Sequence, residues 1–205
     1  MLYCWTASHI NVHARLVWLL QDLIPSIQCA SEVARHYISI SFLNENWQKE
    51  FTQAIQYYKN ITVIYQNSQL SQFDHLDRIF KAYQFNEDDK ILFMDDDDIL
   101  VYIPREYATY DVLLGVQELM PTVPGDRSLV ITDFSGFTAK YELVMHYFRD
   151  RDSTQYGCLE DCRFTRCVQA STASVFRDDV FFVKRRTHSV SCWTDEIVQS
   201  LLERL

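Results

Sequence analysis

Strand-like and helix-like segments alternate three times in the first hundred residues of this chain. Short apolar or alternating runs predict strands over residues 2–6, 37–43 and 61–65. Apolar side chains at helical spacing predict helices over residues 12–27, 45–59 and 73–83. A strand, a helix and the next strand in this order form a parallel pair with a right-handed crossover. The pattern therefore predicts an α/β fold with a mostly parallel central sheet that helices flank.

A fourth apolar run, residues 91–94, leads directly into four aspartates, Asp95, Asp96, Asp97 and Asp98. Adjacent carboxylates repel one another, and proteins that gather them commonly offset the repulsion with a cation. Oxygen ligands suit Mg²⁺ or Mn²⁺, and open parallel sheets bind ligands beyond the carboxyl ends of their strands. The run therefore predicts a divalent metal site. A solvated acidic turn or helix start is the alternative, because aspartate is also favoured there.

The second half of the chain predicts further elements around the same sheet. Helices are expected over residues 105–120, 139–150, 159–170 and 195–205, and strands over residues 129–132 and 180–184. Residues 7–11 are expected to form the loop after the first strand. Because no linker and no internal repeat interrupts these patterns, we expect a single domain over residues 1–205.

The composition fits a globular protein and excludes some classes of function. The chain has 205 residues, 48% of them hydrophobic, which is enough to bury a full core. The formal net charge of -9 disfavours a nonspecific nucleic-acid binder, since phosphate binding needs a basic face. Neither an apolar run of membrane-spanning length nor a secretory signal is visible. We therefore expect a cytoplasmic protein with no membrane span and no nucleic-acid partner.

The order of these parts resembles the GT-A glycosyltransferases, especially the family-2-like enzymes that use nucleotide sugars. The resemblance extends from Trp5 to about His188, and residues 91–100 are similar to the strand and D-x-D-D motif of that family. It implies a Rossmann-like GT-A domain that transfers a sugar from a nucleoside diphosphate, most simply a UDP-sugar, to a hydroxyl of a glycan or glycoprotein. It also implies a nucleotide-binding half over residues 1–100 and an acceptor-binding half over residues 101–205. Such a domain suits a catalytic module of a viral or microbial glycosyltransferase, in the host cytoplasm if viral.

The resemblance further implies roles for individual residues of a donor site. Asp95 and Asp97 would ligate Mn²⁺ or Mg²⁺, with His188, in the loop after the last strand, as a further ligand. Contacts with the nucleotide would come from the loop after the first strand, from the third helix and from the aspartates. These contacts are assigned to Thr6, Ala7, Ser8, Arg78, Asp95 and Asp96.

Glu160 and Asp161 resemble the E-D pair that carries the catalytic base in inverting members of the family. Sugar transfer needs the charge of the departing diphosphate neutralised, which a bound metal does as a Lewis acid. A carboxylate within hydrogen-bond reach can take the proton of the attacking hydroxyl. The resemblance therefore implies an inverting rather than a retaining enzyme, with Asp161 as the base. Helix capping is the alternative for this pair, because acids are favoured in a first helical turn.

Other readings stay open for single residues and for the whole chain. Arg78 could pair with Asp74 or Asp77 at the surface, and a lone histidine such as His188 is often structural. A phosphohydrolase of the haloacid dehalogenase type also carries D-x-D after a strand, but a Gly-Thr pair normally follows, and here Asp98 and an isoleucine do. A non-catalytic relative that binds a nucleotide or serves as a scaffold is the last alternative, since fold does not fix function.

Overall fold

The computed structural model describes residues 1–120, 129–131, 135–151, 160–171 and 174–186. In these ranges the strands are β1 (Leu2–Ile10), β2 (Val33–Phe42), β3 (Ile61–Gln66), β4 (Lys90–Phe93), β5 (Ile99–Leu100), β6 (Val112–Met120), β7 (Leu129–Ile131), β8 (Thr138–Lys140) and β9 (Val175–Arg186). The helices are α1 (His13–Trp18), α2 (Ile24–Cys29), α3 (Glu45–Ile55), α4 (Gln72–Ala82), α5 (Tyr141–Asp150) and α6 (Glu160–Ala170). A π-helix, η1 (Leu19–Leu23), joins α1 to α2, and a 3-10 helix, η2 (Arg105–Ala108), precedes β6.

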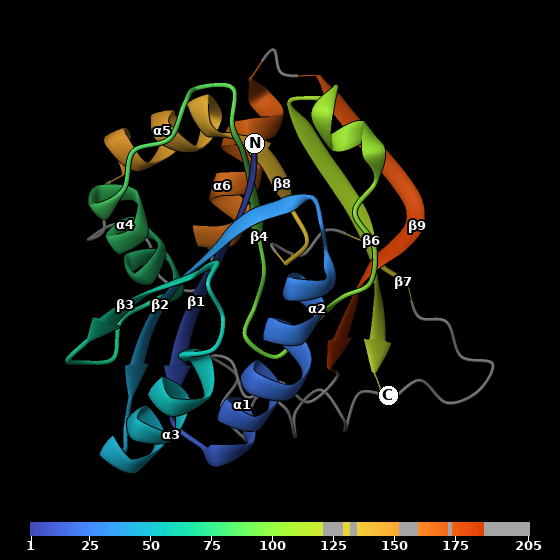
Figure 1. The fold of residues 1–205 in the computed structure, drawn as a ribbon. Helices are drawn as coiled ribbons and strands as arrows, with labels where there is room; N and C mark the ends of the chain where they lie inside the picture. Colours follow the sequence, from blue (N-terminus) through green and yellow to red (C-terminus); the bar gives the residue numbers. More distant parts are fainter. Residues whose placement is uncertain (121–128, 132–134, 152–159, 172–173, 187–205) are drawn as a thin grey trace, which may run out of the picture.

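The described strands form one sheet in the order β3-β2-β1-β4-β8-β6-β9-β5, with β7 paired to β6. The strands β3, β2, β1 and β4 are parallel neighbours, as are β6 and β9. Because β8 is antiparallel to both β4 and β6, these two groups run in the same direction, opposite to β5, β7 and β8. The prediction of an α/β fold with a mostly parallel sheet and flanking helices is confirmed (Figure 1).

Local sequence explains where several helices begin. The side chain of Asn44 accepts a hydrogen bond from the backbone N–H of Asn46 and caps α3. Ser71 caps α4 in the same way, through the backbone N–H of Asp74 at 3.1 Å. Pro25 lies in the first turn of α2, where its missing N–H costs little, and the wider π-helical turn lies directly before it. The predicted helix over residues 12–27 is therefore one helical segment with an irregular middle.

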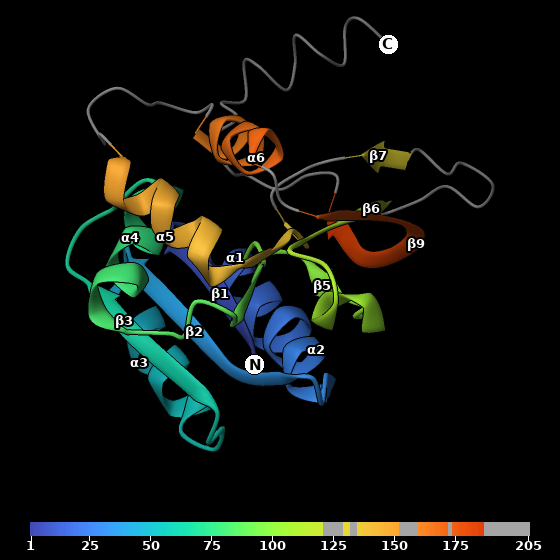
Figure 2. The ribbon, with the colours of Figure 1, turned by 90° about the horizontal axis from the view of Figure 1, so that it is seen from above.

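The helices α1–α3 cover one face of the sheet and α4–α6 the other (Figures 1 and 2), and an apolar core lies on each face. Alternate residues of β1 enter them, since Cys4 belongs to the core under α1–α3 and Trp5 to the core under α4–α6. The second core is rich in aromatic rings, and Phe164 of α6 packs edge-on against Phe93 and Phe137 at centroid distances of 5.3 and 5.5 Å. Burial of each such ring contributes about 1.5–3 kcal/mol. This contact holds α6 over the carboxyl end of β4.

The structure corrects four sequence-based expectations about elements. The helix predicted over residues 105–120 is wrong, because this stretch forms η2 and then β6, whose apolar run of Val112, Leu113 and Leu114 is buried inside the sheet. The loop predicted over residues 7–11 is also wrong, because β1 continues to Ile10. The last strand begins at Val175 rather than at residue 180, and the short strands β5 and β8 were not predicted. The helix predicted over residues 195–205 lies outside the described residues.

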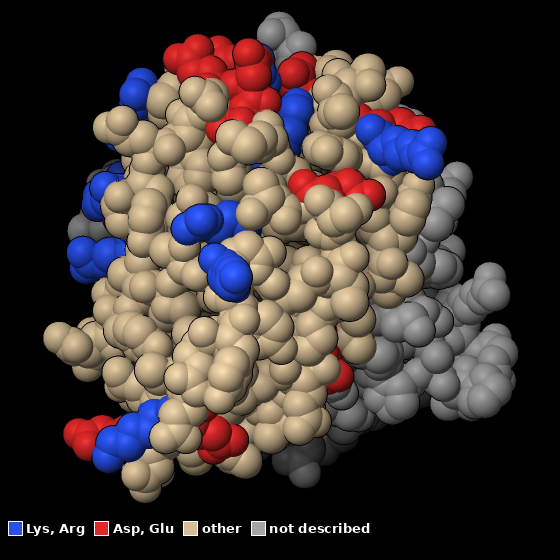
Figure 3. Space-filling model, viewed as in Figure 1, with Lys and Arg blue, Asp and Glu red and all other residues tan. Residues whose placement is uncertain are grey.

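No helix within the described ranges is long and apolar enough to cross a membrane. The face of the molecule drawn in Figure 3 carries its Lys and Arg side chains in small separate groups among Asp and Glu side chains.

Candidate metal and nucleotide site

The site is built where β4 ends beside the middle of β1. These strands pair from Leu2 and Lys90 to Trp5 and Phe93, and the backbone N–H of Met94 donates to the Trp5 carbonyl at 3.1 Å. The chain runs from β1 outward to β2 and β3 and then returns to β4 on the other side of β1. This reversal of strand order is the point where open α/β sheets bind ligands beyond the carboxyl ends of their strands. Residues 95–98, here called the aspartate turn, follow β4 at this point.

Asp96 differs from the other three aspartates of the turn, because its carboxylate is bonded to β1 and α1. Its Oδ2 accepts from the Ser8 hydroxyl of β1 at 2.6 Å, and its Oδ1 accepts from Nη2 of Arg15 of α1 at 2.6 Å. Burial by itself would lower the pKa of Arg15, but the negative charges of Asp96, Asp97 and Asp95 raise it above its ordinary value. Arg15 is therefore a permanent cation beside the turn.

The other three aspartates bring their carboxylates together. One oxygen from each of Asp95, Asp97 and Asp98 lies within 4.8 Å of the others. Oxygen atoms on opposite sides of a bound Mg²⁺ are about 4.2 Å apart, since each lies about 2.1 Å from the ion. Asp97 and Asp98 are 3% and 0% exposed, so their charges lie inside the protein. The donor set and its spacing therefore fit a small hard cation such as Mg²⁺ or Mn²⁺.

Two neighbours orient Asp95 at the more open side of the cluster. Gln72, the first residue of α4, donates from Nε2 to Asp95 Oδ1 at 2.6 Å. The Ser135 hydroxyl accepts from the backbone N–H of Asp95 at 3.1 Å. Ser135 is held there by the backbone beside it, because the N–H of Gly136, at φ 81°, donates to the Phe93 carbonyl.

The structure thus brings together two of the predicted metal ligands, Asp95 and Asp97, and adds Asp98 to them. The four-aspartate run itself was the signal for Asp98, whereas no local pattern indicated Arg15. His188, the third predicted ligand, lies outside the described residues. Asp96, predicted to contact the nucleotide, has both carboxylate oxygens already bonded inside the protein.

Thr6, Ala7 and Ser8 lie within β1 and not in a loop after it. The Thr6 hydroxyl is fully buried and 2.9 Å from Nε2 of His36, while the Ser8 hydroxyl is bonded to the aspartate turn. Both hydroxyls face the core under α1–α3, because they alternate with Ala7 along the strand. The nucleotide contacts assigned to these three residues stay a prediction.

A row of hydrogen-bonded side chains lies on the other face of the sheet at the same end. His9 Nδ1 is 2.8 Å from the Ser41 hydroxyl, which is 3.3 Å from Nε2 of His75. Nδ1 of His75 is in turn 2.9 Å from the Ser39 hydroxyl. Burial, with the positive charge of His9 second, lowers the pKa of His75 to about 4, so this imidazole is neutral at pH 7.

Arg78 lies on α4 away from the aspartate turn. It is exposed and lines a cleft of about 500 Å³ between α4 and α5, together with Asp77, Lys81 and Arg149. No residue of the aspartate turn lines that cleft. The described structure therefore does not bring Arg78 together with the other predicted donor-site residues.

Glu160, one of the two predicted catalytic acids, begins α6 and is buried. Its carboxylate accepts from Nε of Arg151, from Nη2 of Arg151 at 3.0 Å and from the Tyr147 hydroxyl at 3.3 Å. Asp161 follows in the same helical turn. Because the Glu160 carboxylate is engaged by three donors, we expect it to hold α6 in place rather than to take a proton.

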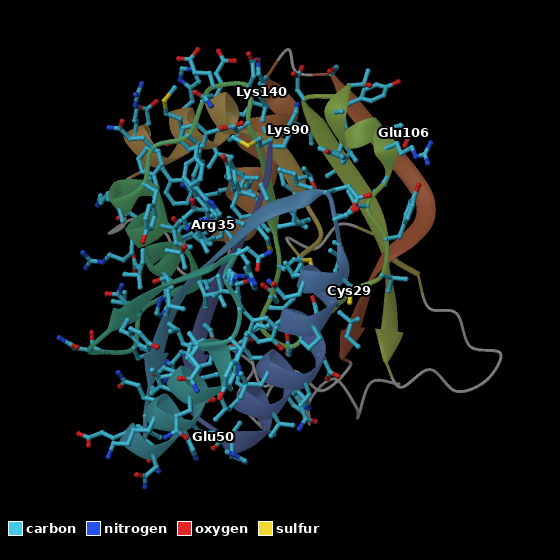
Figure 4. All side chains as sticks on the ribbon, viewed as in Figure 1. Cys29, Arg35, Glu50, Lys90, Glu106 and Lys140 are labelled. Carbon is cyan, nitrogen blue, oxygen red and sulfur yellow. The ribbon has the colours of Figure 1, made fainter. Side chains whose placement is uncertain are left out.

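The amino end of β4, opposite the aspartate turn, carries two lysines that both have partners. Figure 4 shows Lys90 and Lys140 at the end where β4 begins, far along the strand from the aspartate turn. Lys90 Nζ donates to the Tyr110 carbonyl, and Lys140 pairs with Asp88 at 2.9 Å. Both lysines therefore bind partners at the amino end of β4 and not at the aspartate turn.

Neither a family model nor a curated protein matches the chain, but solved structures match over most of its length. Residues 1–349 of TarS from S. aureus align with a TM-score of 0.62 and 11% identity, over 91% of this chain and 60% of that one. The nucleoside-diphosphate-sugar pyrophosphorylase of Vibrio cholerae RC9 aligns with a TM-score of 0.56 and 9% identity, over 97% and 99%. The inositol-1-phosphate CTP transferase of T. maritima aligns with a TM-score of 0.55 and 10% identity, over 98% and 96%.

The chain has a Rossmann-like GT-A fold. The alignment with this chain covers 60% of the TarS fragment and 37% of the longer TarS chain, but nearly all of the pyrophosphorylase and of the CTP transferase. At these identities the likeness concerns the fold alone. The fold nevertheless places the aspartate turn at the strand ends where this class of sheet binds its ligands.

Proposed function

We propose that this protein is a metal-dependent glycosyltransferase. It moves a sugar from a nucleoside-diphosphate sugar, a UDP-sugar first among them, to a hydroxyl of a glycan or glycoprotein acceptor. The observation that carries the proposal is the gathering of Asp95, Asp97 and Asp98 at the carboxyl end of β4, beside β1, in a GT-A fold. Residues 1–100 serve as the nucleotide-binding half and residues 101–205 as the acceptor-binding half.

In this proposal the aspartate turn holds Mn²⁺ or Mg²⁺ through Asp95, Asp97 and Asp98. The bound ion supplies Lewis-acid stabilisation of the departing diphosphate. Ser8 and Arg15 hold Asp96 on the α1 side of the turn, which leaves the other three carboxylates facing a common point. The family resemblance adds His188 as a further ligand, and Thr6, Ala7, Ser8, Arg78 and Asp96 as nucleotide contacts. In the described structure Asp96 is bonded to Ser8 and Arg15, and Arg78 lies away from the turn, so these two contacts rest on the resemblance alone.

The acceptor side of the proposal depends on α6. Glu160 is held by Arg151 and Tyr147, so the proposal assigns proton transfer to the other member of the pair, Asp161. A base that takes the hydroxyl proton during a single in-line attack gives inversion at the anomeric carbon. We therefore propose an inverting reaction with Asp161 as its general base.

Nucleotidyl transfer is a second candidate, because the pyrophosphorylase and the CTP transferase are matched over 96% or more of their length. Enzymes that bind a triphosphate on the backbone use a glycine-rich loop before a helix. Here the four glycines all lie after residue 114, and β1 is separated from α1 only by Asn11 and Val12. The short, glycine-free connection favours a diphosphate held by a metal.

One screen distinguishes the two candidates. The purified protein is given UDP-, GDP- or dTDP-sugars with Mn²⁺, and release of the nucleoside diphosphate is measured. In parallel it is given CTP or UTP with sugar phosphates, and pyrophosphate release is measured. Metal-dependent release of the diphosphate alone supports glycosyl transfer, whereas pyrophosphate release alone would replace it with nucleotidyl transfer.

A first prediction tests the metal ligands. Asp97→Asn removes one anionic ligand from the cluster, so the affinity for UDP in the presence of Mn²⁺ is expected to fall at least about 10-fold, by analogy with the loss of a close charge pair. Isothermal calorimetry with UDP and Mn²⁺ measures it. Asp88→Asn, an exposed aspartate at the other end of β4, is the matched control and should bind as the wild type does. Equal affinity in Asp97→Asn and the control would remove the metal site from the proposal.

A further inference from the structure

Arg151, the residue that ends α5, connects the first turns of two other helices. Its Nη2 donates to Asp74 Oδ1 of α4 at 2.9 Å and to Glu160 Oε2 of α6 at 3.0 Å, while its Nε donates to Glu160 Oε1. The side chains of Arg151 and Glu160 are 4% and 5% exposed. A guanidinium with two parallel bonds to one carboxylate fixes direction as well as distance.

The first turn of α4 extends this connection to the aspartate turn. Asp74 lies two residues after Gln72, whose amide donates to Asp95 Oδ1 at 2.6 Å. The Ser71 hydroxyl donates to Asp74 Oδ2 at 2.7 Å and holds that carboxylate at the helix start. A continuous series of hydrogen bonds and one helical turn therefore joins the proposed metal ligand Asp95 to the first turn of α6.

Packing alone does not require this arrangement. The rings of Phe73, Tyr147 and Phe164 already hold α4, α5 and α6 together, with centroids 5.0–6.0 Å apart. Buried ion pairs commonly add little net stability over apolar residues of similar size, because both charges lose their hydration. What the ion network adds to the aromatic contacts is a fixed orientation of one helical turn relative to another.

We infer that Arg151 is a positioning residue that sets the first turn of α6 relative to the aspartate turn. This inference rests on the proposed function, because that turn of α6 carries Asp161, the proposed base. A general base must lie within hydrogen-bond reach of the acceptor hydroxyl while the donor is held at the metal. A displacement of about 1 Å at such a site can cost 10²-fold in rate. Arg151 touches no reacting atom and acts through Glu160 and Asp74.

The test compares Arg151→Lys with Asp77→Asn in the full chain. Arg151→Lys keeps the charge but loses the two-bond geometry, whereas Asp77→Asn removes a carboxylate of α4 whose partner, Lys81, is exposed. Three quantities are measured: the turnover with the best donor of the screen above, the dissociation constant of UDP with Mn²⁺, and the hydrogen exchange of α6 amides. A second variant, Asp74→Asn, cuts only the connection to α4.

Arg151→Lys is expected to lower turnover about 10- to 100-fold, with UDP affinity within 2-fold of the wild type and faster exchange in the first turn of α6. Asp74→Asn should lower turnover in the same direction, and Asp77→Asn should change none of the three. Turnover within 2-fold of the wild type in Arg151→Lys, or an equal loss of turnover and UDP affinity, would overturn the inference.

Failure of the proposed function gives a different result. If the wild type releases no diphosphate from any donor, the glycosyltransferase assignment falls. The exchange measurement then decides the connection between helices by itself. Exchange of the first α6 amides that is equal in Arg151→Lys and Asp77→Asn would show that Arg151 does not set this turn.

Discussion

Asp96 is a buried carboxylate whose two oxygens are each satisfied by a different element, Ser8 of β1 and Arg15 of α1. It is 1% exposed, so its charge is separated from water and depends on the Arg15 guanidinium. Removing one member of a buried pair leaves the other charge uncompensated. The residue next to the proposed metal ligands therefore contributes to the fold, although it belongs to the same run of four aspartates.

Arg15→Gln is therefore expected to destabilise the protein by about 3–5 kcal/mol, the usual cost of breaking a buried ion pair. The free energy of unfolding in urea measures this change. Lys81→Gln is the matched control, because the Lys81 side chain is exposed and its pair with Asp77 lies within one helix, so its loss should cost less than about 1 kcal/mol.

The double variant Arg15→Gln/Asp96→Asn separates charge from packing. If the uncompensated charge causes the loss, the double variant should be more stable than the sum of the two single changes by about 1–3 kcal/mol. Strict additivity of the two changes would contradict the pairing.

The sequence predicted Asp95 and Asp97 because their signal is local: consecutive acids directly after an apolar strand. It did not predict Gln72 or Ser135 as their partners, which are 23 and 40 residues away from Asp95 along the chain. Whether two distant polar side chains meet depends on the register of strands and on helix rotation, and no short pattern records these. Thr6 and Ser8 were assigned to a loop for a similar reason, because small polar residues at the end of a strand also suit a turn.

At the scale of elements, the sheet carries one buried, neutral histidine on each face, His36 under α1–α3 and His75 under α4–α6. His36 of β2 faces Thr6 of β1, and His75 of α4 faces Ser39 and Ser41 of β2. Burial lowers the pKa of His36 to about 3, and burial together with His9 lowers the pKa of His75 to about 4. Both imidazoles are folded into the protein without charge.

These two buried histidines predict that the protein loses stability in acid. The unfolded chain binds these two protons near pH 6.5, whereas the folded chain binds them only near pH 3–4. Stability from this source is therefore fully present above about pH 6.5 and declines as the pH falls toward 4. Each histidine contributes a slope of about 1.4 kcal/mol per pH unit in that range.

Urea unfolding between pH 7 and pH 4.5 measures the slope. His75→Gln keeps a hydrogen-bonding side chain and should reduce the slope by about 1.4 kcal/mol per pH unit, whereas His146→Gln, at an exposed position, should leave it unchanged. An identical slope in the wild type and in His75→Gln would show that this imidazole is not buried without charge.

The helices of the first hundred residues were predictable because each has one buried face and so a clear period, and the strands β1 and β4, buried on both faces, because they are short apolar runs. The stretch from Val112 to Leu114 was not, because its side chains are buried on both faces of the sheet. A continuous apolar run fits a helix segment and a central strand equally well. The strands β5 and β8 were too short, at two and three residues, to give any period.

At the scale of the whole molecule, one sheet crosses the boundary between the two proposed halves. β4 pairs with β8, and β8 pairs with β6, so the strands before and after residue 100 form one hydrogen-bonded layer. The core under α4–α6 also draws on both halves, since Phe93 packs against Phe137 and Phe164. The nucleotide-binding and acceptor-binding halves are therefore expected to be functional regions of a single folding unit.

A chain cut after residue 104 should accordingly fail to fold. It keeps Trp5, Phe73 and Phe93 but loses the rings of α5 and α6 that pack on them, so that only α4 still covers that face of the sheet. A two-dimensional NMR spectrum of residues 1–104 is expected to show poor dispersion, and urea should produce no cooperative transition. A well-dispersed spectrum with a sigmoidal unfolding curve would show instead that the first half is an independent domain.

The Ser8–Asp96 hydrogen bond joins residues 88 positions apart along the chain. Closing a loop of that length costs about 4 kcal/mol of chain entropy before any contact within it offsets the loss. The parallel pairing of β1 with β4 carries the same entropy cost. Topologies with many such distant pairs fold in milliseconds to seconds rather than microseconds. On a ribosome, β1 emerges long before its partner, so the strand that carries Ser8 waits unpaired on that side until β4 has been synthesised. The aspartate turn and the residues that orient it consequently assemble together, as one of the later events of folding.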